Sequence, residues 1–220
     1  MTRIFIEDDY DSFADFHDKD WLLKQFELTK GTRIEAQLSA FGAAWWGHAR
    51  AFFLPWLFIG SIHDLMTQNF HVRNSTKQEL WDEYLKVHGF KAALWKLAEN
   101  SYCGLYYAYE LLIVDVINTE LEQPTRVTNR DFNQKISSHF GQSIGSRLWN
   151  DPHISTAREV RNCLVHNGGI ASQKLLGMQE LPMIDNHRIM ISASDTRELY
   201  STLKDRVQLL VEQETGQLGS

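Results

Sequence analysis

The sequence predicts an all-α fold, an up-and-down helical bundle with an N-terminal helical extension. Leu, Ala, Trp and Phe are abundant, and only four prolines interrupt the 220 residues. Capping patterns precede several apolar runs, and apolar residues in those runs repeat at helical spacing. A chain of this length can bury a full core, so we expect one domain with an extension. The expected exception to helix is a small β-hairpin just before the last helix.

We expect residues 1–89 to form an acidic leader and a helical extension that packs on the bundle. Eight acidic and three basic residues precede position 30. A long apolar helix should follow, because Thr32 and Glu35 have the spacing of a capping box. It should run to about position 70, with a kink at Pro55. A second helix is expected over 75–87.

The apolar stretch 40–62 raises the question of a membrane span, which needs about 20 apolar residues. His48 and Arg50 interrupt this stretch, and Pro55 breaks it. We therefore expect a helix that is buried or faces another subunit, and no membrane association. The first residues are acidic and lack the apolar segment of a signal peptide, and the chain has only two cysteines. These features predict a cytoplasmic protein without a disulfide.

Residues 90–213 should form the bundle itself, followed by a flexible tail over 214–220. Asp195 and Glu198 are expected to cap the last helix. A hairpin should precede it, because two short apolar runs flank the polar segment 185–188. The helices are expected at about 90–121, 128–141, 143–149, 156–167 and 195–213.

The helix expected over 156–167 has an unusual residue pattern. Thr156 and Glu159 have capping-box spacing, and Gly168 is the residue type that most often ends a helix in the left-handed conformation. At about 100° per residue, Arg161 falls inside the apolar arc of this helix, while His166 lies on the polar side. A buried arginine is costly unless it meets a carboxylate, a phosphate or a second subunit. The apolar arc consists of Ala157, Val160, Cys163, Leu164 and Val165.

The segment Arg161-Asn162, three further residues and His166, followed by Asn167-Gly168-Gly169, resembles the signature of HEPN domains. These are helical modules of prokaryotic defence and toxin systems. The resemblance covers roughly residues 90–213 and implies a metal-independent endoribonuclease without a cofactor. It also implies a homodimer, in which two such helices meet and form a composite active site.

The side chains of this motif suit RNA cleavage by the RNA's own 2′-hydroxyl, which leaves a 2′,3′-cyclic phosphate and a 5′-hydroxyl. His166 can move a proton near neutral pH, and the planar guanidinium of Arg161 matches phosphate oxygens. Asn162 lies one turn before His166 and could orient the imidazole or the phosphate. Arg161 and His166 are about 140° apart on one helix, so a partner subunit would complete the site. The resemblance also implies an acidic or polar residue on a helix packed against the motif helix. Glu110, on the long helix expected over 90–121, is the candidate to hold Arg161, and a salt bridge to another Arg or Lys is an equal alternative.

The net charge of −6 argues against a general nucleic-acid binder, but the charge is unevenly distributed. Residues 124–169 contain six basic and three acidic residues, so the region around the motif should attract a phosphate backbone. A solvated, slightly basic helix pair would have the same composition. The expected RNA contacts are Arg130, Lys135, Arg147 and Arg158.

Other interpretations are compatible with the same residues. Arg161 could form an internal ion pair, and His166 could cap the helix C-terminus. The domain could also be a non-catalytic RNA-binding or dimerisation module, or a regulatory partner. If the protein is a toxin or a defence protein, an antitoxin or another defence-system protein is an expected partner. In toxins of this family that a nucleotidyltransferase regulates, a tyrosine commonly occupies the position of Gly168, so the glycine argues against this regulation. No His-Glu-x-x-His or Cys-x-x-Cys pattern occurs, so no metal site is expected.

Overall fold

The computed structural model describes residues 19–69 and 90–216. This part of the chain is mainly helical with one two-stranded hairpin, so the prediction of an all-α fold is confirmed. The leader before Lys19 and the helix expected over 75–87 lie outside the described residues. None of the described helices is long and apolar enough to cross a membrane.

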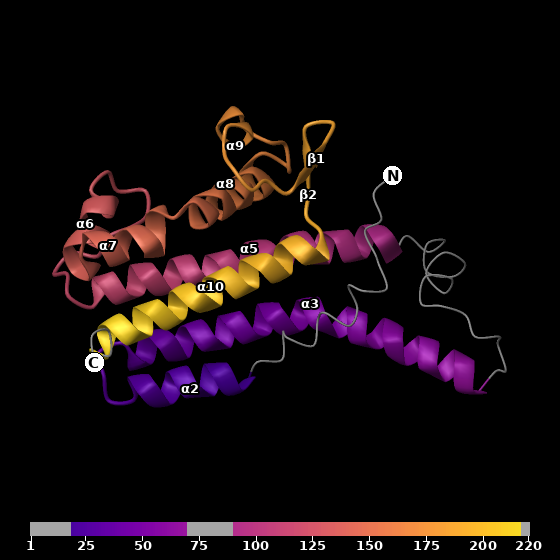
Figure 1. Cartoon of the computed structure of the whole chain (residues 1–220), viewed down its shortest axis with the longest axis horizontal. Coiled ribbons are helices and arrows are strands. Elements are labelled where there is room, and N and C mark those ends of the chain that lie inside the picture. Colours follow the sequence, from indigo (N-terminus) through magenta and orange to yellow (C-terminus); the bar gives the residue numbers. More distant parts are fainter. Residues whose placement is uncertain (1–18, 70–89, 217–220) are drawn as a thin grey trace.

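Four helices form the main layer and run side by side in Figure 1. They are α2 (Lys19–Thr29), α3 (Glu35–Asn69), α5 (Phe90–Asn118) and α10 (Ala193–Glu214). Trp45 of α3 lies in their shared core, where its ring stacks on Tyr200 of α10 at 4.7 Å. Phe41 and Trp21 contact the same ring. The N-terminal helices α2 and α3 therefore share one core with the C-terminal helices.

Helix α2 lies in the segment expected to be an acidic leader, so that expectation is wrong for residues 19–29. Trp21, Leu22 and Gln25 are buried on one side of the helix. The helical pattern of buried positions is weak in the sequence of α2, because these positions are few and charged residues separate them. Short helices of this kind are stabilised mainly by tertiary packing, in this case against α3.

Helix α3 begins without the expected capping box of Thr32 and Glu35. The Glu35 carboxylate accepts a hydrogen bond from the Gly31 N–H at 2.8 Å, and the Thr32 hydroxyl donates to the Thr29 carbonyl at 2.6 Å. Gly31 has a left-handed φ of 75°, which glycine adopts without strain. The tight turn between α2 and α3 therefore uses both side chains for other contacts. From Glu35, α3 continues as a helix through Pro55.

The remaining elements form a second layer, which lies over α5 and α10 in Figure 1. They are α6 (Phe132–Phe140), α7 (Gln142–Gly145), a π-helical turn (Ser146–Asn150), α8 (Pro152–His166), α9 (Gln173–Leu176), β1 (Met183–Asp185) and β2 (Arg188–Met190). α6 and α7 lie at one end of this layer, and α9 and the hairpin lie at the other. α8 connects the two ends and packs against α5.

The predicted hairpin is confirmed as the antiparallel pair β1–β2. The last helix starts slightly earlier than expected, because Ser192 caps it. The Ser192 Oγ accepts from the Asp195 N–H at 3.1 Å, and the Asp195 carboxylate accepts from the Ser192 N–H at 2.7 Å. The expected caps are therefore wrong: Asp195 is the third residue of the helix, and Glu198 lies inside it.

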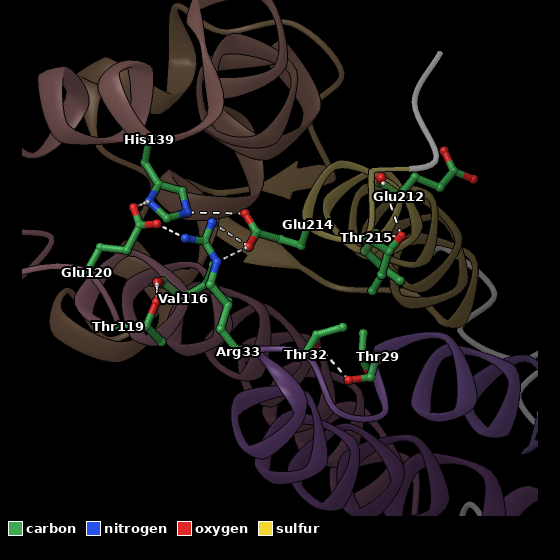
Figure 2. A network of polar contacts seen from close by, with 11 residues as sticks. Thr29, Thr32, Arg33, Val116, Thr119, Glu120, His139, Glu212, Glu214 and Thr215 are labelled. Carbon is green, nitrogen blue, oxygen red and sulfur yellow. Dashed lines mark hydrogen bonds and ion pairs between the residues drawn. The ribbon is translucent and has the colours of Figure 1, made fainter. Parts of the chain in front are cut away.

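Three charged side chains and one histidine from distant parts of the chain meet at one end of the bundle (Figure 2). The Glu214 carboxylate accepts a hydrogen bond from Arg33 Nε at 2.9 Å and lies 3.2 Å from His139 Nε2. The other ring nitrogen of His139 lies 2.8 Å from the Glu120 carboxylate, which also pairs with Arg33. We call Arg33, Glu120, His139 and Glu214 the terminal ion cluster. Glu214 thus belongs to the folded end of α10 rather than to the expected tail.

Candidate functional site

Helix α8, which contains the motif, begins at Pro152 rather than at Thr156. Asp151 caps it by accepting a hydrogen bond from the His153 N–H at 3.0 Å. Pro152 fits the first helical position, where a missing N–H has no consequence. The capping box expected from Thr156 and Glu159 is therefore wrong, since both residues lie inside the helix.

Thr156 and Glu159 instead fix the segment that follows α8. The Thr156 hydroxyl donates to the Gln179 carbonyl at 3.0 Å. The Glu159 carboxylate accepts from Ser172 Oγ at 2.7 Å and from Lys174 Nζ at 2.8 Å. Burial acts to raise the pKa of Glu159, but the hydrogen bonds from Lys174 and Ser172 hold it below its ordinary value. α9 is consequently held against α8.

The end of α8 agrees with the prediction of a glycine stop. Gly168 and Gly169 have left-handed φ values of 60° and 81°. The Gly169 N–H donates to the Cys163 carbonyl at 3.0 Å and so closes the last turn. His166 is the last residue of the helix, and it is exposed.

Arg161 is largely buried between α8 and α5, with 19% of its side chain exposed. Its Nη2 lies 3.8 Å from the Glu110 carboxylate, so the contact expected between these residues is present. Its Nη1 donates to Asn162 Oδ1 at 3.0 Å. Burial raises the pKa of Glu110, and the Arg161 guanidinium opposes that rise. A guanidinium has five N–H donors, so these contacts leave donors for a phosphate.

The Asn162 side chain is directed to Arg161 rather than to His166. Of the two positions expected for its amide, the structure therefore shows the one beside the Arg161 guanidinium and not the one beside the His166 imidazole. α8 brings Arg161 and Asn162 together and leaves His166 at the solvent-exposed helix end.

Three exposed apolar side chains lie within about one helical turn of Glu110 or Arg161 along their helices. On α5, Tyr107 comes three residues before Glu110 and Leu111 directly after it, and they are 50% and 39% exposed. On α8, Val165 lies one turn after Arg161 and is 54% exposed. Val165 belongs to the apolar arc of the predicted helix, yet it does not face the core of this subunit.

Arg158, one of the expected RNA contacts, is used inside the protein. Its guanidinium lies 3.8 Å from the centre of the Trp149 ring. It also donates to the Tyr106 hydroxyl at 2.9 Å and to the Trp149 carbonyl at 2.7 Å. We therefore correct its role to that of a structural residue, which ties α8 to α5 and to the π-helical turn.

The other three expected RNA contacts lie away from His166. Arg130 and Arg147 are exposed, and Lys135 pairs with Asp131 at 3.1 Å. All of them come from the end of the second layer that contains α6 and α7 (Figure 1). His166 lies at the opposite end, next to α9 and the hairpin, so the structure does not gather these cations around the motif.

Two exposed residues that the sequence assigned only to a turn, His187 and Arg188, lie beside residues 169–171, the segment that follows His166. Their position depends on hydrogen bonds between β2 and the segment after α8. No local sequence signal marks such a pairing, because the two segments are separated along the chain.

Other reactive groups near the motif are few. Burial raises the pKa of Cys103 to about 11, so its thiol stays protonated at neutral pH and is a poor nucleophile. Within residues 19–69 and 90–216, no group of three or more His, Cys, Asp or Glu side chains could hold a metal ion.

No protein-family model matches the chain, no curated protein matches its sequence, and no solved structure matches its fold. The class that the fold defines is a mainly helical bundle of two layers with one small hairpin. Its functional assignment rests on the residues of α8 and on their neighbours in α5.

Proposed function

We propose that the protein is a metal-independent endoribonuclease of the HEPN type. The observation that carries this proposal is the placement of Arg161 on the same helix as the exposed His166. The Arg161 guanidinium contacts Glu110 of α5 and Asn162 of α8. The helix thus combines a phosphate-binding cation with a residue that transfers protons near neutral pH. RNA supplies the nucleophile, its own 2′-hydroxyl.

The reaction starts when this hydroxyl attacks the adjacent phosphorus atom. Either a His166 imidazole takes the proton of the hydroxyl while water gives a proton to the departing 5′ oxygen, or a His166 imidazolium gives that proton while water takes the proton of the hydroxyl. Negative charge grows on the non-bridging oxygens, and the N–H donors of Arg161 stabilise it. Glu110 and Asn162 restrict the guanidinium to one orientation. The products are a 2′,3′-cyclic phosphate and a 5′-hydroxyl.

The complete site requires two subunits in this proposal. Tyr107, Leu111 and Val165 are exposed within about one helical turn of Glu110 or Arg161, and exposed apolar side chains of this kind suit an isologous contact between two copies. Such a contact brings two α8 helices together at the axis. Arg161 of one protomer then acts on the same phosphate as His166 of the other.

The first experiment measures cleavage of single-stranded RNA by the wild type and by His166→Ala. The variant should lose cleavage and keep its RNA affinity and melting temperature, because His166 is exposed. His153→Ala is a control at the other end of α8, where the imidazole lies 2.6 Å from the Glu180 carboxylate, and it should cleave normally. EDTA should leave the wild-type activity intact, and a substrate with 2′-deoxy nucleotides should resist cutting. Raised salt should slow the reaction.

Wild-type cleavage by His166→Ala, or complete loss of activity in EDTA, would contradict the mechanism. RNA binding without any cleavage by the wild type would identify the alternative, a non-catalytic binding module in which Arg161 forms only its internal ion pair with Glu110.

The second experiment tests the composite site by mixing two inactive variants, Arg161→Ala and His166→Ala. After exchange of subunits, about half of the dimers are mixed, and each contains one site with both residues intact. Roughly a quarter of the wild-type activity should therefore return. No recovery, despite proven exchange, would mean that both residues act within one protomer.

A further inference from the structure

The hairpin is attached to the backbone that directly follows the motif helix. The Ile189 N–H donates to the Gly169 carbonyl at 2.9 Å, and the Ala171 N–H donates to the His187 carbonyl at 2.8 Å. Ile170 pairs with Arg188 between them. Because the Gly169 N–H also bonds to the last turn of α8, β2 is fixed beside the end of the helix that carries His166.

The turn of the hairpin contains an unfavourable choice of residue. Asn186 and His187 both have left-handed backbones, with φ values of 47° and 64°. Two-residue turns of this kind prefer Asn followed by Gly, because a β-carbon is strained in the left-handed region. The first residue follows this preference and the second does not. Strained residues of this type concentrate at functional sites, which points to a use for the His187 imidazole.

The turn also contains a basic residue, Arg188, whose side chain is exposed. His187 and Arg188 are exposed, and no ion pair or side-chain hydrogen bond joins either of them to a described residue. Asp185 lies opposite Arg188 in the strand register, but the two do not form an ion pair. By contrast, Arg158 is used inside the protein, and Lys174 is paired with Glu159. Arg188 is therefore available to a phosphate near the end of α8.

We propose that the hairpin turn binds the RNA strand beside the scissile phosphate, with Arg188 on a backbone phosphate and His187 stacked on an unpaired base. The proposal rests on the proposed ribonuclease function and deepens it, because it names single-stranded RNA as the substrate. Arg188 forms a charge-assisted contact, and histidine rings are common stacking partners of unpaired bases. Both are binding residues and take no part in proton transfer.

The test measures binding of a labelled single-stranded oligoribonucleotide by fluorescence anisotropy, with every variant built on His166→Ala so that the probe stays intact. Arg188→Gln should weaken binding about tenfold. It should also lower the slope of log K against log salt by about 0.7, the value for one phosphate contact on a single strand. His187→Gly should weaken binding about tenfold, because stacking is lost.

His187→Gly also separates binding from folding. Glycine relieves the strain of the turn, so the melting temperature should stay equal or rise while the affinity falls. Asn186→Gly is the matched control, because it changes the same turn and keeps the imidazole. It should bind RNA like its parent.

Each outcome has one meaning. Parental affinity and salt slope in both Arg188→Gln and His187→Gly would overturn the hairpin proposal and leave the ribonuclease proposal standing, provided that the parent binds RNA. Equal loss of affinity in Asn186→Gly would also overturn it, because the shape of the turn rather than its side chains would then matter. A parent that does not bind RNA would overturn both proposals.

Discussion

Arg158 and Arg161 are three residues apart on α8, but their guanidinium groups have different surroundings. Arg158 stacks on Trp149 and donates to the Tyr106 hydroxyl. Arg161 faces the Glu110 carboxylate, and its neighbour Asn162 accepts one of its hydrogen bonds. The first guanidinium is held by an aromatic ring, a hydroxyl and a backbone carbonyl of the fold, whereas the second contacts the polar side chains of Glu110 and Asn162.

Arg158→Lys should destabilise the protein, since an ammonium group cannot stack on Trp149 and reach both oxygen acceptors at once. We expect the free energy of unfolding to fall by about 1–2 kcal/mol in a urea titration. Arg147→Gln is the matched control, because Arg147 is exposed, and it should unfold within about 0.5 kcal/mol of the wild type. If Arg158→Lys unfolds at the same urea concentration as the wild type, the contacts specific to the guanidinium contribute nothing.

At the scale of elements, the close approach of α3 to α5 depends on a glycine. A β-carbon at Gly104 of α5 would lie 2.2 Å from Nδ1 of His48 on α3. His48 is partly buried at this contact, and desolvation lowers its pKa. The neutral imidazole thus packs directly against the backbone of the facing helix.

Gly104→Ala should force the two helices or the imidazole apart and lower the free energy of unfolding by about 1–3 kcal/mol, in spite of the higher helix propensity of alanine. Gly47→Ala is a control on α3 itself, where an added β-carbon meets nothing within 4 Å. That variant should be more stable than the wild type by up to about 1 kcal/mol. Equal stability of the two variants in urea would show that the His48 ring has room to move.

At the scale of the whole molecule, the terminal ion cluster joins the start of α3, the end of α5, α6 and the end of α10 (Figure 2). Burial acts to raise the pKa of Glu214, but hydrogen bonds from His139 and Arg33 hold it below its ordinary value of 4.5. A carboxyl group with a lowered pKa in the folded state stabilises that state above the unfolded pKa. This contribution is lost as the pH falls below 4.5 and through the folded pKa.

Glu214→Gln should therefore be less stable than the wild type at pH 7, by about 3 kcal/mol for a buried and paired carboxylate. The difference should shrink below pH 4.5, where protonated Glu214 resembles glutamine. Urea titrations between pH 3 and pH 7 measure both values, with Glu212→Gln as a control outside the cluster. A difference that stays constant with pH would mean that the charge of Glu214 is not what links the four elements.

The sequence by itself determined the helical class of the protein, the hairpin before the last helix and the glycine stop of α8. These features follow from local rules, because helical periodicity and turn residues are visible in the order of residues. The cost of a buried arginine predicted that Arg161 needs a partner, but only the structure selected Glu110 among the possible partners. The signature Arg161-Asn162-His166 is local in the same sense.

Only the tertiary structure decided where several helices begin and which elements lie beside the motif. It also decided which of the basic side chains form internal contacts with other described residues. Thr156 and Glu159 have the spacing of a capping box, yet they bond to residues 172–179. Arg158 is a basic residue in the basic region 124–169 and was expected to contact RNA, yet its guanidinium stacks on Trp149. The hairpin reaches α8 through hydrogen bonds between segments that are distant in sequence. In each case a polar side chain or backbone group found its partner far along the chain, and burial favours such pairing over the local one because an unpaired polar group in the interior costs free energy.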